Sequence, residues 1–355
     1  MQVQYIIVGQ GICGTFLSWQ LMQAGQSICV IDTAQPFSST KVASGVINPV
    51  TGRQIVTTWL AEELLPFCMN SYTAIGETIG ADVIQNCPVM AFPPSQQMQE
   101  AYAKKMQLPG SYIQPVAETI QQQYDPLFYF RHGVVAINPS LLIQLHPLLK
   151  GWRSVLSGKG VLRETAFDAG RLALHEGSVA YDDIHAEKII FCDGLNTFGN
   201  PWWGKLPFVA NKGQALIIDV PGLPQSNIYK FGPTTLVPWY DGLWWAGSSY
   251  ENDFEDALPT DAFKKAATAA LQTVIRQPFT VVDHLASIRP ACIERRPFVG
   301  FHPQYPQIGI LNGMGTKGCS LAPYFAAQLT GYLVNNTPIM PEAAVQRFAR
   351  SLARG

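Results

Sequence analysis

Two glycine-rich turns and one acidic residue carry the clearest chemical signal in this sequence. The first turn, Gly9 to Gly14, has the spacing G-x-G-x-x-G and follows an apolar run at residues 3 to 8. Asp32 ends a second apolar run, 18 residues after Gly14. In a βαβ unit Gly9 would make the tight turn, Gly11 would let a pyrophosphate approach the helix N-terminus, and Gly14 would let helix and strand pack closely. The acid would hold an adenosine ribose hydroxyl. The pattern predicts a dinucleotide site; the alternative is a tight turn without a ligand. The predicted contacts are Gly9, Gly11, Ile12, Cys13, Gly14 and Asp32.

The second turn, Gly313 to Gly318, lies between an apolar run at residues 308 to 311 and a helical pattern at about 320 to 334. Only 37 residues follow Gly318, and they contain no further strand that ends in an acid. A second nucleotide is therefore not expected. A helix N-terminus stabilises negative charge. A flavin ring becomes anionic when it is reduced, whereas NAD has no such group. The two turns together favour FAD, with contacts from Gly313, Met314, Gly315, Thr316, Lys317, Gly318 and Cys319.

The elements that must position these turns indicate an α/β protein. Continuous apolar runs such as residues 3–8 and 28–31 are typical of parallel strands. Between residues 206 and 288 strands alternate with polar turns, as in an antiparallel sheet. Asn138-Pro139 is expected to start a helix that runs to about Leu149.

At 355 residues the chain is long enough for two domains. We predict a Rossmann-type FAD-binding domain and a discontinuous α+β substrate domain built on an antiparallel sheet. The FAD-binding domain is predicted to comprise residues 1–81, 137–205 and 289–355, and the substrate domain residues 82–136 and 206–288.

Composition argues against several classes of function. The net charge is −1 and charged residues make up 14%, so bulk charge attracts the protein neither to nucleic acid nor to an anionic membrane. No apolar run reaches the roughly 18 residues of a spanning helix, and we expect no secretory signal. The seven cysteines are scattered without metal-binding spacing, which favours the cytoplasm and predicts no metal site. The oligomeric state cannot be read from the sequence.

Six short motifs, in this order, resemble those of the D-amino-acid oxidase superfamily of FAD enzymes. Their spacing is most similar to that of glycine oxidase and sarcosine oxidase. The resemblance covers nearly the whole chain except roughly residues 82 to 136. The motifs are the first glycine turn, Ser44 to Pro49, Lys212-Gly213-Gln214, Leu236-Val237-Pro238, Ile288-Arg289-Pro290 with 297–303, and Asn312 to Pro323.

The resemblance implies further cofactor contacts. Asp32 and Thr33 would contact the ribose, although the family usually has Glu at the position of Asp32. The backbone at Ala166 or Phe167 would meet adenine. The strand that ends at Asp193 and Gly194 is expected to arrive beside the ligand. The residues expected along the pyrophosphate and isoalloxazine are Ser39, Thr40, Ser44, Gly45 and Val46.

Arg289 is the expected clamp for a substrate carboxylate, because a guanidinium binds a carboxylate bidentately. It matches the position that holds the substrate in glycine oxidase-like proteins; the alternative is a structural arginine paired with Asp283 or Glu294. Glycine oxidase-like members usually carry Asp in the neighbourhood that Arg295 and Arg296 occupy here. The identity of the substrate therefore stays undetermined.

Lys317 is expected to support the reduced flavin or its reaction with oxygen; the alternative is a solvated loop lysine. The same two alternatives apply to Lys212. Cys292 is out of register with the cysteine that attaches flavin in sarcosine oxidase-like relatives, so we expect noncovalent FAD. Four aromatic residues could wall the substrate site or simply be core, namely Tyr229, Trp239, Trp244 and Trp245.

These observations predict an FAD-dependent oxidoreductase that oxidises the C–N bond of a small amino acid or secondary amine. A hydride would pass to flavin N5, water would hydrolyse the imine, and O2 would be reduced to H2O2. Three alternatives remain: a dehydrogenase with another electron acceptor, an oxidase of a carboxymethylaminomethyl-type tRNA uridine, and a flavin-binding protein without turnover. Lys104, Lys105, Arg295 and Arg296 are the basic residues a tRNA would need.

Overall fold

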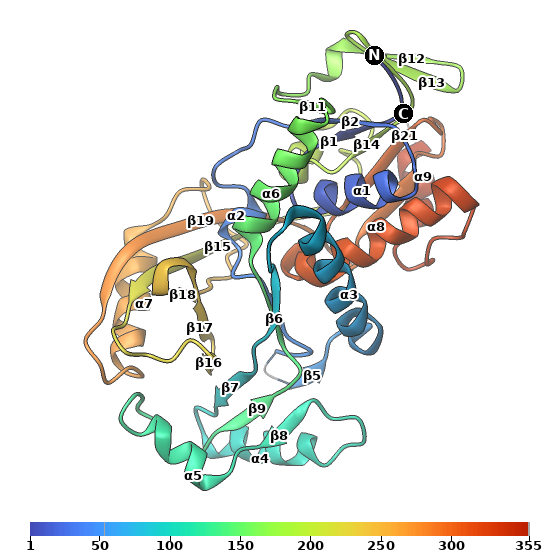
Figure 1. The fold of residues 1–355 in the computed structure, drawn as a ribbon. Helices are drawn as coiled ribbons and strands as arrows, with labels where there is room; N and C mark the ends of the chain where they lie inside the picture. Colours follow the sequence, from blue (N-terminus) through green and yellow to red (C-terminus); the bar gives the residue numbers. More distant parts are fainter. Residues whose placement is uncertain (53, 354–355) are drawn as a thin grey trace.

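Two eight-stranded sheets, each built from segments far apart in the sequence, organise the chain (Figure 1). The computed structural model describes residues 1–52 and 54–353. Residues 53, 354 and 355, which belong to the predicted FAD-binding domain, lie outside the described residues. The combination of a largely parallel sheet and a largely antiparallel sheet confirms the predicted fold class.

The first sheet has the strand order β11-β2-β1-β14-β13-β12, with β21 and β20 attached at β14. Strands β11, β2, β1, β14 and β21 run parallel. Their continuous apolar runs fit a sheet that is covered on both faces. The strands are β1 (Gln2–Val8), β2 (Ile28–Ile31), β11 (Leu162–Arg163), β12 (Leu172–His175), β13 (Ser178–Tyr181), β14 (Ile184–Phe191), β20 (Phe298–Phe301) and β21 (Ile308–Asn312).

Four helices pack together on one face of this sheet, and their apolar side chains share one core with it. Trp152 of the third helix is fully buried, and its Nε1 donates to Ser18 Oγ (2.8 Å) of the first. The opposite face is covered by Trp203 and by Val345 and Leu352 near the C-terminus. The four helices are α1 (Ile12–Gln23), α3 (Ala61–Ile79), α6 (Leu145–Gly158) and α8 (Gly318–Asn335).

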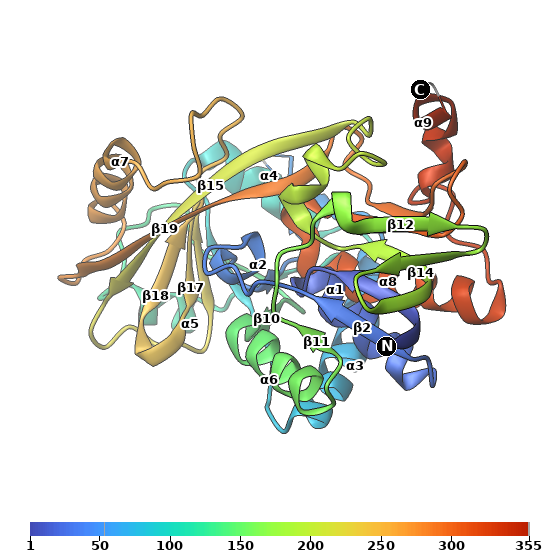
Figure 2. The same ribbon diagram turned by 90° about the horizontal axis from the view of Figure 1, so that it is seen from above.

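The second sheet has the order β19-β15-β18-β17-β16-β7-β9-β8, and only the pair β16–β7 is parallel. Figure 2 shows β15 and β19 as the long strands that run from this sheet toward the first. Helix α7 (Asp261–Gln272) covers one face, and the other face packs against helix α4 (Gln96–Met106) and the small sheet that contains β10 (Leu141–Ile143). The strands are β7 (Val89–Phe92), β8 (Ile113–Pro115), β9 (Val135–Ile137), β15 (Phe208–Asp219), β16 (Ile228–Phe231), β17 (Thr234–Pro238), β18 (Trp244–Gly247) and β19 (Thr280–Cys292).

The other strands, helices and turns are short. Two small sheets have the orders β3-β10-β6 and β4-β5. Their strands are β3 (Val46–Ile47), β4 (Val50–Thr51), β5 (Val56–Thr57), β6 (Ile84–Asn86) and β10 (Leu141–Ile143). The remaining helices are α2 (Ser39–Val42), α4 (Gln96–Met106), α5 (Glu118–Gln121) and α9 (Ala349–Ala353), with 3₁₀ turns η1 (Gln122–Tyr124), η2 (Ala169–Arg171), η3 (Gly194–Gly199), η4 (Tyr240–Gly242), η5 (Gly315–Lys317) and η6 (Val345–Phe348).

The helix expected to start at Asn138-Pro139 begins later, so that prediction was wrong. Residues Leu141–Ile143 form β10, which pairs with β3 on one side and β6 on the other. Helix α6 starts at Leu145 and continues past the expected end at Leu149 to Gly158. Pairing with two strands outweighs the helical pattern at its beginning, because it satisfies the backbone groups of this buried segment.

Replacing Trp152 should destabilise the packing of α6 against α1. Trp152→Leu removes buried ring volume and leaves Ser18 Oγ without its donor, so we expect the free energy of unfolding to fall by roughly 3–5 kcal/mol. Denaturant unfolding of the apoprotein measures this change. Lys159→Ala, at the exposed C-terminal end of the same helix, should change it by less than about 0.5 kcal/mol. Equal effects of the two variants would contradict the role of Trp152 in packing α6 against α1.

Candidate active site

The carboxyl ends of three parallel strands open into one large cavity. Its wall includes Gly9 after β1, Asp32 after β2 and Asp193 after β14, and it extends to Arg289 on the second sheet. Ligands of doubly wound folds bind at this edge of the sheet. The cavity has a volume of about 1670 Å³, which exceeds the roughly 300–1,000 Å³ of ordinary small-molecule pockets. It is large enough for an extended dinucleotide together with a small second molecule.

Most residues predicted to contact a cofactor line this cavity. They come from both glycine turns, from the segment after β2, and from the ends of β11 and β14. Their roles toward a cofactor remain predictions. The residues are Gly9, Gly11, Ile12, Cys13, Asp32, Thr33, Ser39, Thr40, Ser44, Phe167, Asp193, Gly194, Met314, Gly315, Thr316, Gly318 and Cys319.

Three of the predicted glycines are not in the wall of this cavity and instead permit close packing. A Cβ at Gly14 would lie 1.8 Å from the carbonyl oxygen of Gly9, and one at Gly45 would lie 2.2 Å from that of Ile143. At Gly313, where φ is +78°, a Cβ would lie 2.7 Å from the ring of Phe298. These glycines therefore shape the turns. Val46 and Lys317 also lie outside the large cavity and line a separate small one.

The N-terminus of α1 faces the large cavity. Gly11, the N-cap residue, has no side chain to cap the helix, and Thr40 Oγ1 accepts from a single N–H group, that of Ile12 (3.2 Å). Among the described residues, Thr40 Oγ1, at 3.4 Å, is the only atom within 4 Å of a Cβ built at Gly11. The backbone is thus open to a ligand, and free N–H groups with the helix dipole favour an anion here.

Asp32 is held in a fixed orientation at the end of β2. Its Oδ2 accepts from Gln10 N (2.8 Å). Its Oδ1 accepts from Ala34 N (2.6 Å) and from Arg153 Nη1 (2.7 Å) of α6. The predicted ribose-binding carboxylate is therefore part of a network that includes a distant arginine.

The second glycine turn is tied to the end of β14. Asn312 Nδ2 donates to Gly194 O (2.9 Å) and to Thr197 Oγ1 (2.7 Å), and Thr197 Oγ1 donates to Asp193. These bonds hold the second glycine turn beside the end of β14. Helix α8 begins at Gly318 without a side-chain cap, and Gly318 lines the cavity. The positive end of its dipole can stabilise negative charge there.

Arg289 lies on β19 with its guanidinium across Gly213. A Cβ at Gly213 would lie 1.8 Å from Arg289 Nη2, so the glycine of the Lys-Gly-Gln motif makes room for this side chain. Nη1 donates to Asn211 Oδ1 (2.6 Å), and Nη2 donates to Ser248 Oγ (3.1 Å) and Ser249 O (3.4 Å). Burial lowers the pKa of Arg289, which still leaves the group charged.

Neither carboxylate proposed as a structural partner binds Arg289. Glu294 accepts from Arg347 Nε (3.0 Å), and Asp283 accepts from His284 N (2.7 Å). Within residues 1–52 and 54–353, Arg289 has no ion-pair partner and bonds only neutral acceptors. Its charge is therefore available to an anionic ligand.

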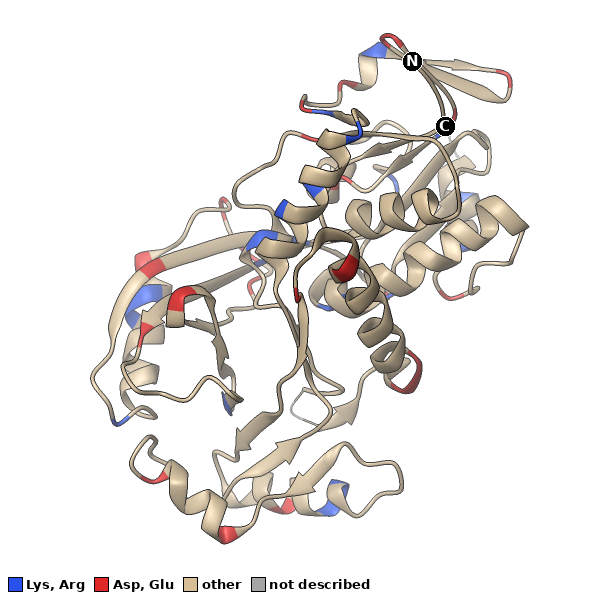
Figure 3. Cartoon of the chain, viewed as in Figure 1, with Lys and Arg blue, Asp and Glu red and all other residues tan. Residues whose placement is uncertain are grey.

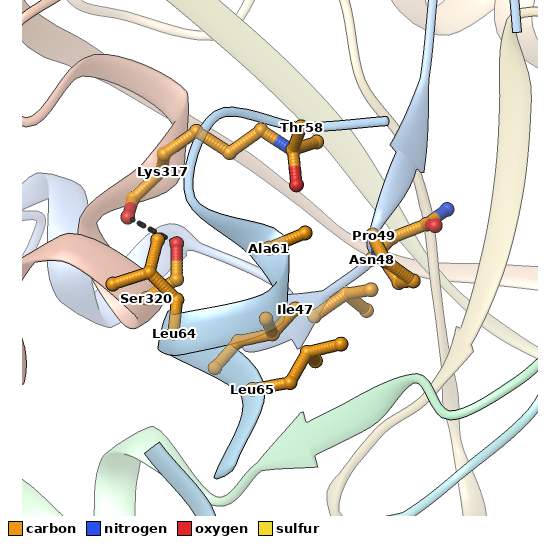
Figure 4. Close-up of a pocket in the computed structure, with 10 residues that line it drawn as sticks. Ile47, Asn48, Pro49, Thr58, Ala61, Leu64, Leu65, Lys317 and Ser320 are labelled. Carbon is orange, nitrogen blue, oxygen red and sulfur yellow. Dashed lines mark hydrogen bonds between the residues drawn. The ribbon is translucent and has the colours of Figure 1, made fainter. Parts of the chain in front are cut away.

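Lys317 extends toward Thr58 above the small cavity, whose wall also includes Asn48 (Figure 4). This cavity has a volume of about 10 Å³, which is room for one water-sized group. Burial lowers the pKa of the Lys317 ammonium to about 8, against the opposing effect of Cys319, and Lys230 lowers it further. Among the described residues the ammonium has no hydrogen-bond or ion-pair partner.

Lys212 does not face the large cavity. Side chains alternate along a strand, and Asn211, its neighbour on β15, already lies on the face of Arg289. Lys212 is buried on the other face, where its Nζ is 3.7 Å from Asp256 Oδ1. Lys212 is thus not in the wall of the cavity that the two glycine turns line.

Only Trp245 of the four proposed aromatic residues lines the large cavity, and its Nε1 donates to Val42 O (3.0 Å). Tyr229 and Trp244 belong to the core on the opposite face of the second sheet. Trp239 packs at the edge of the core between the second sheet and α4. Cys292 is buried in the core of the first sheet.

Several residues that line the cavity were missed from the sequence. Arg153, Lys150 and His146 all project from α6, and Lys41 comes from α2. The spacing of His146, Lys150 and Arg153 by four and three residues is a recognisable signal of one helical face. It was obscured because the helix was expected to end at Leu149.

The fold and the cavity define a dinucleotide-binding α/β protein whose second sheet closes over the site. More specifically, the chain belongs to the DAO family of FAD dependent oxidoreductases, whose model matches residues 4–333. This confirms the family predicted from the six motifs. The chain is therefore an enzyme of an FAD-dependent family that acts on amino acids and amines.

Three solved structures share this fold over almost the whole chain. Iminodiacetate oxidase (IdaA) from Chelativorans sp. BNC1 is 19% identical with a TM-score of 0.75, covering 94% of this chain and 96% of that one. Glycine oxidase from Geobacillus kaustophilus is 15% identical with a TM-score of 0.76, covering 95% and 96%. L-proline dehydrogenase from P. horikoshii is 13% identical with a TM-score of 0.75, covering 98% of each chain. At these identities the likeness establishes the fold.

In residues 1–52 and 54–353 no helix has the length and apolar character needed to cross a membrane. In the same residues no three His, Cys, Asp or Glu side chains gather as metal ligands would.

Asp193→Asn should stabilise the apoprotein near neutral pH. Burial raises the pKa of Asp193 from 3.8 to about 6, despite the hydrogen bond from Thr197. Because the folded-state pKa lies above the unfolded value, the stability that the protonated carboxyl contributes is lost as the pH rises from about 4 through 6. Asparagine keeps an acceptor for Thr197 without the charge, so we expect a gain of roughly 1–3 kcal/mol at pH 7.5.

Denaturant unfolding at pH 7.5 and near pH 4 measures this difference. The gain should disappear near pH 4, where the carboxyl is already protonated. A gain of the same size at both pH values would show that burial of the charge is not its cause.

Proposed function

We propose that the large cavity binds one FAD molecule noncovalently along both glycine turns. Its pyrophosphate would meet the open N-terminus of α1, its ribose Asp32, and its flavin the N-terminus of α8. The described cysteines in the wall are Cys13, Cys192 and Cys319. Burial raises the pKa of the Cys13 and Cys319 thiols to about 12, and protonated thiols are poor nucleophiles. All seven cysteines are free, which fits a reducing compartment, the cytoplasm.

We propose that the protein oxidises the C–N bond of a small amino acid or secondary amine. FAD, when bound, supplies the chemistry by accepting a hydride equivalent from the carbon beside the nitrogen. Overall, the amine, O2 and water give a carbonyl compound, an amine or ammonia, and H2O2. The task of the chain is then to orient the substrate.

Arg289 would bind the substrate carboxylate. Its Nη2 makes only longer contacts, to Ser248 Oγ (3.1 Å) and Ser249 O (3.4 Å), which a carboxylate can replace with stronger charge-assisted bonds. Its Nη1 would stay anchored to Asn211 (2.6 Å). The observation that carries the proposal is this guanidinium, without an acidic partner, in the wall of the cavity that both glycine turns line.

The names of the structural neighbours support this substrate class. Glycine oxidase is named for an amino acid, and iminodiacetate oxidase for a secondary amine that carries carboxylates. L-proline dehydrogenase is named for a cyclic secondary amine. Its name also favours a second candidate, a dehydrogenase that passes electrons to an acceptor other than O2.

Action on a tRNA uridine gains no support from the placement of the basic residues. Lys104 and Lys105 lie near the end of α4, whereas Arg295 and Arg296 lie in the turn between β19 and β20. The Arg296 guanidinium is 4.0 Å from the ring centroid of Trp59. These side chains lie on separate elements.

Arg289→Lys should slow reduction of the FAD-loaded protein by substrate roughly 30- to 100-fold, because a point charge replaces a bidentate fork. Anaerobic mixing with a panel of amino acids and N-methylated amines, followed by flavin absorbance, identifies the substrate and measures this rate. Gly213→Ala, which would displace the guanidinium, should reproduce the effect. Lys104→Ala is the matched surface control.

Two outcomes would contradict the proposal. Reduction by no member of the panel would reject the reaction class. Rapid reduction of both the wild type and Arg289→Lys would reject the clamp alone. Repeating turnover with and without O2 then separates the oxidase from the dehydrogenase.

Lys317→Met should slow reoxidation of the substrate-reduced protein by O2 about tenfold at pH 7. The ammonium, with its pKa lowered to about 8, is charged below this pH and can stabilise negative charge on reduced oxygen. The wild-type rate should therefore fall as the pH rises through 8, and the rate of the variant should stay flat. Stopped-flow measurement of flavin absorbance gives both profiles. If the variant keeps the wild-type rate and its alkaline decline, Lys317 has no part in reoxidation.

A further inference from the structure

Helix α6 carries a basic face that lies along the large cavity. His146, Lys150 and Arg153 all line it, and Figure 3 shows basic residues recurring along this helix. The acidic residues that line the cavity within the described part of the chain are Asp32 and Asp193. The wall near α6 is therefore more positive than the net charge of −1 suggests.

Arg153 is the most firmly placed member of this face. Its Nη1 donates to Asp32 Oδ1 (2.7 Å) and to Gln10 Oε1 (3.1 Å), and its Nη2 donates to the Asp32 backbone oxygen (3.2 Å). Nη2 is also 3.4 Å from Glu164 Oε2. The side chains of Arg153 and Asp32 are only 18% and 17% exposed, so solvent screens this pair less than an ordinary surface pair.

These contacts leave Asp32 with little free capacity. A carboxylate has about four acceptor positions. Gln10 N occupies one on Oδ2, and Ala34 N and Arg153 Nη1 occupy both on Oδ1. One position remains, whereas a ribose presents two hydroxyl groups. Arg153 Nε, for its part, donates to none of the described residues.

We propose that Arg153 and Asp32 together form the recognition unit for the adenosine half of FAD. Asp32 accepts one ribose hydroxyl at its free Oδ2 position, and Arg153 donates to an oxygen of the ribose or its phosphate while it holds the carboxylate in place. This inference rests on the proposed binding of FAD. It assigns a cofactor-binding role to a residue 121 positions away from Asp32 in the sequence.

The geometry also explains how a shorter acid can serve at this position. The resemblance predicts Glu where this chain has Asp32, and the shorter side chain reaches less far into the site. A guanidinium from the facing helix adds donors on the side that the carboxylate does not reach. Recognition is thereby shared between β2 and α6.

The test is the dissociation constant of the apoprotein for two probes, FAD and ADP. ADP contains the adenosine half and lacks the flavin. Arg153→Met should weaken both probes by the same factor, about ten- to a hundredfold, because one charge-assisted hydrogen bond and the support of Asp32 are lost. Arg153→Lys keeps the charge but lacks the guanidinium fork, so its dissociation constants should lie between those of the wild type and of Arg153→Met. Lys159→Ala, at the exposed end of α6, should match the wild type.

A double-mutant cycle with Asp32→Asn shows whether the two residues act as a unit. Adding Arg153→Met to Asp32→Asn should weaken FAD binding less than it does in the wild type. If Arg153→Met alone folds poorly, the comparison of Asp32→Asn with the double variant still measures the donor that Arg153 adds, because Asp32→Asn removes the carboxylate that would be left without its cation.

The outcomes distinguish this inference from the proposed function. Wild-type apoprotein that binds no FAD would reject both. Wild-type protein that binds FAD, together with an Arg153→Met variant of unchanged affinity, would reject only the role of Arg153. Weaker FAD binding with unchanged ADP binding would also reject it, because the effect would then arise at the flavin end.

Discussion

The structure depends on two helix N-termini that open into the same cavity. Helix α1 follows Gly11 and α8 follows Lys317, and neither N-cap residue supplies a side-chain cap. The free N–H groups at such ends are satisfied best by an anion. Asn312, bonded to Gly194 and Thr197, ties the turn before α8 to the end of β14, the strand that pairs with β1. One elongated ligand with phosphate at one end and a charge-accepting ring at the other would satisfy both.

The remaining elements hold the wall between these two ends. The segment at residues 37–44 contains the short helix α2 (Ser39–Val42), and bonds to its backbone oxygens fix its position. These bonds come from both the second sheet and α6, so the segment is held between them. The donors are Ser287 Oγ to Phe37 O (3.0 Å), Trp245 Nε1 to Val42 O (3.0 Å) and His146 Nε2 to Lys41 O (2.8 Å).

Local patterns in the sequence predicted the turns, the family and the placement of Arg289 at the cavity, because each depends on neighbouring residues. Directions that depend on tertiary packing could not be predicted. Lys317, which points to the small cavity, is an example. The partnership of Arg153 with Asp32 requires α6 to lie against β2, and the start of α6 was misplaced because strand pairing by β10 leaves no local signature.

The central claim is that one FAD molecule spans the cavity from Asp32 to the turn at Gly313–Cys319. A crystal structure of the protein grown with FAD tests it most directly. The account predicts density for a single extended FAD, with its adenosine beside Asp32 and its flavin beside the N-terminus of α8. Density for FAD in another cleft, or with its ends reversed, would contradict it.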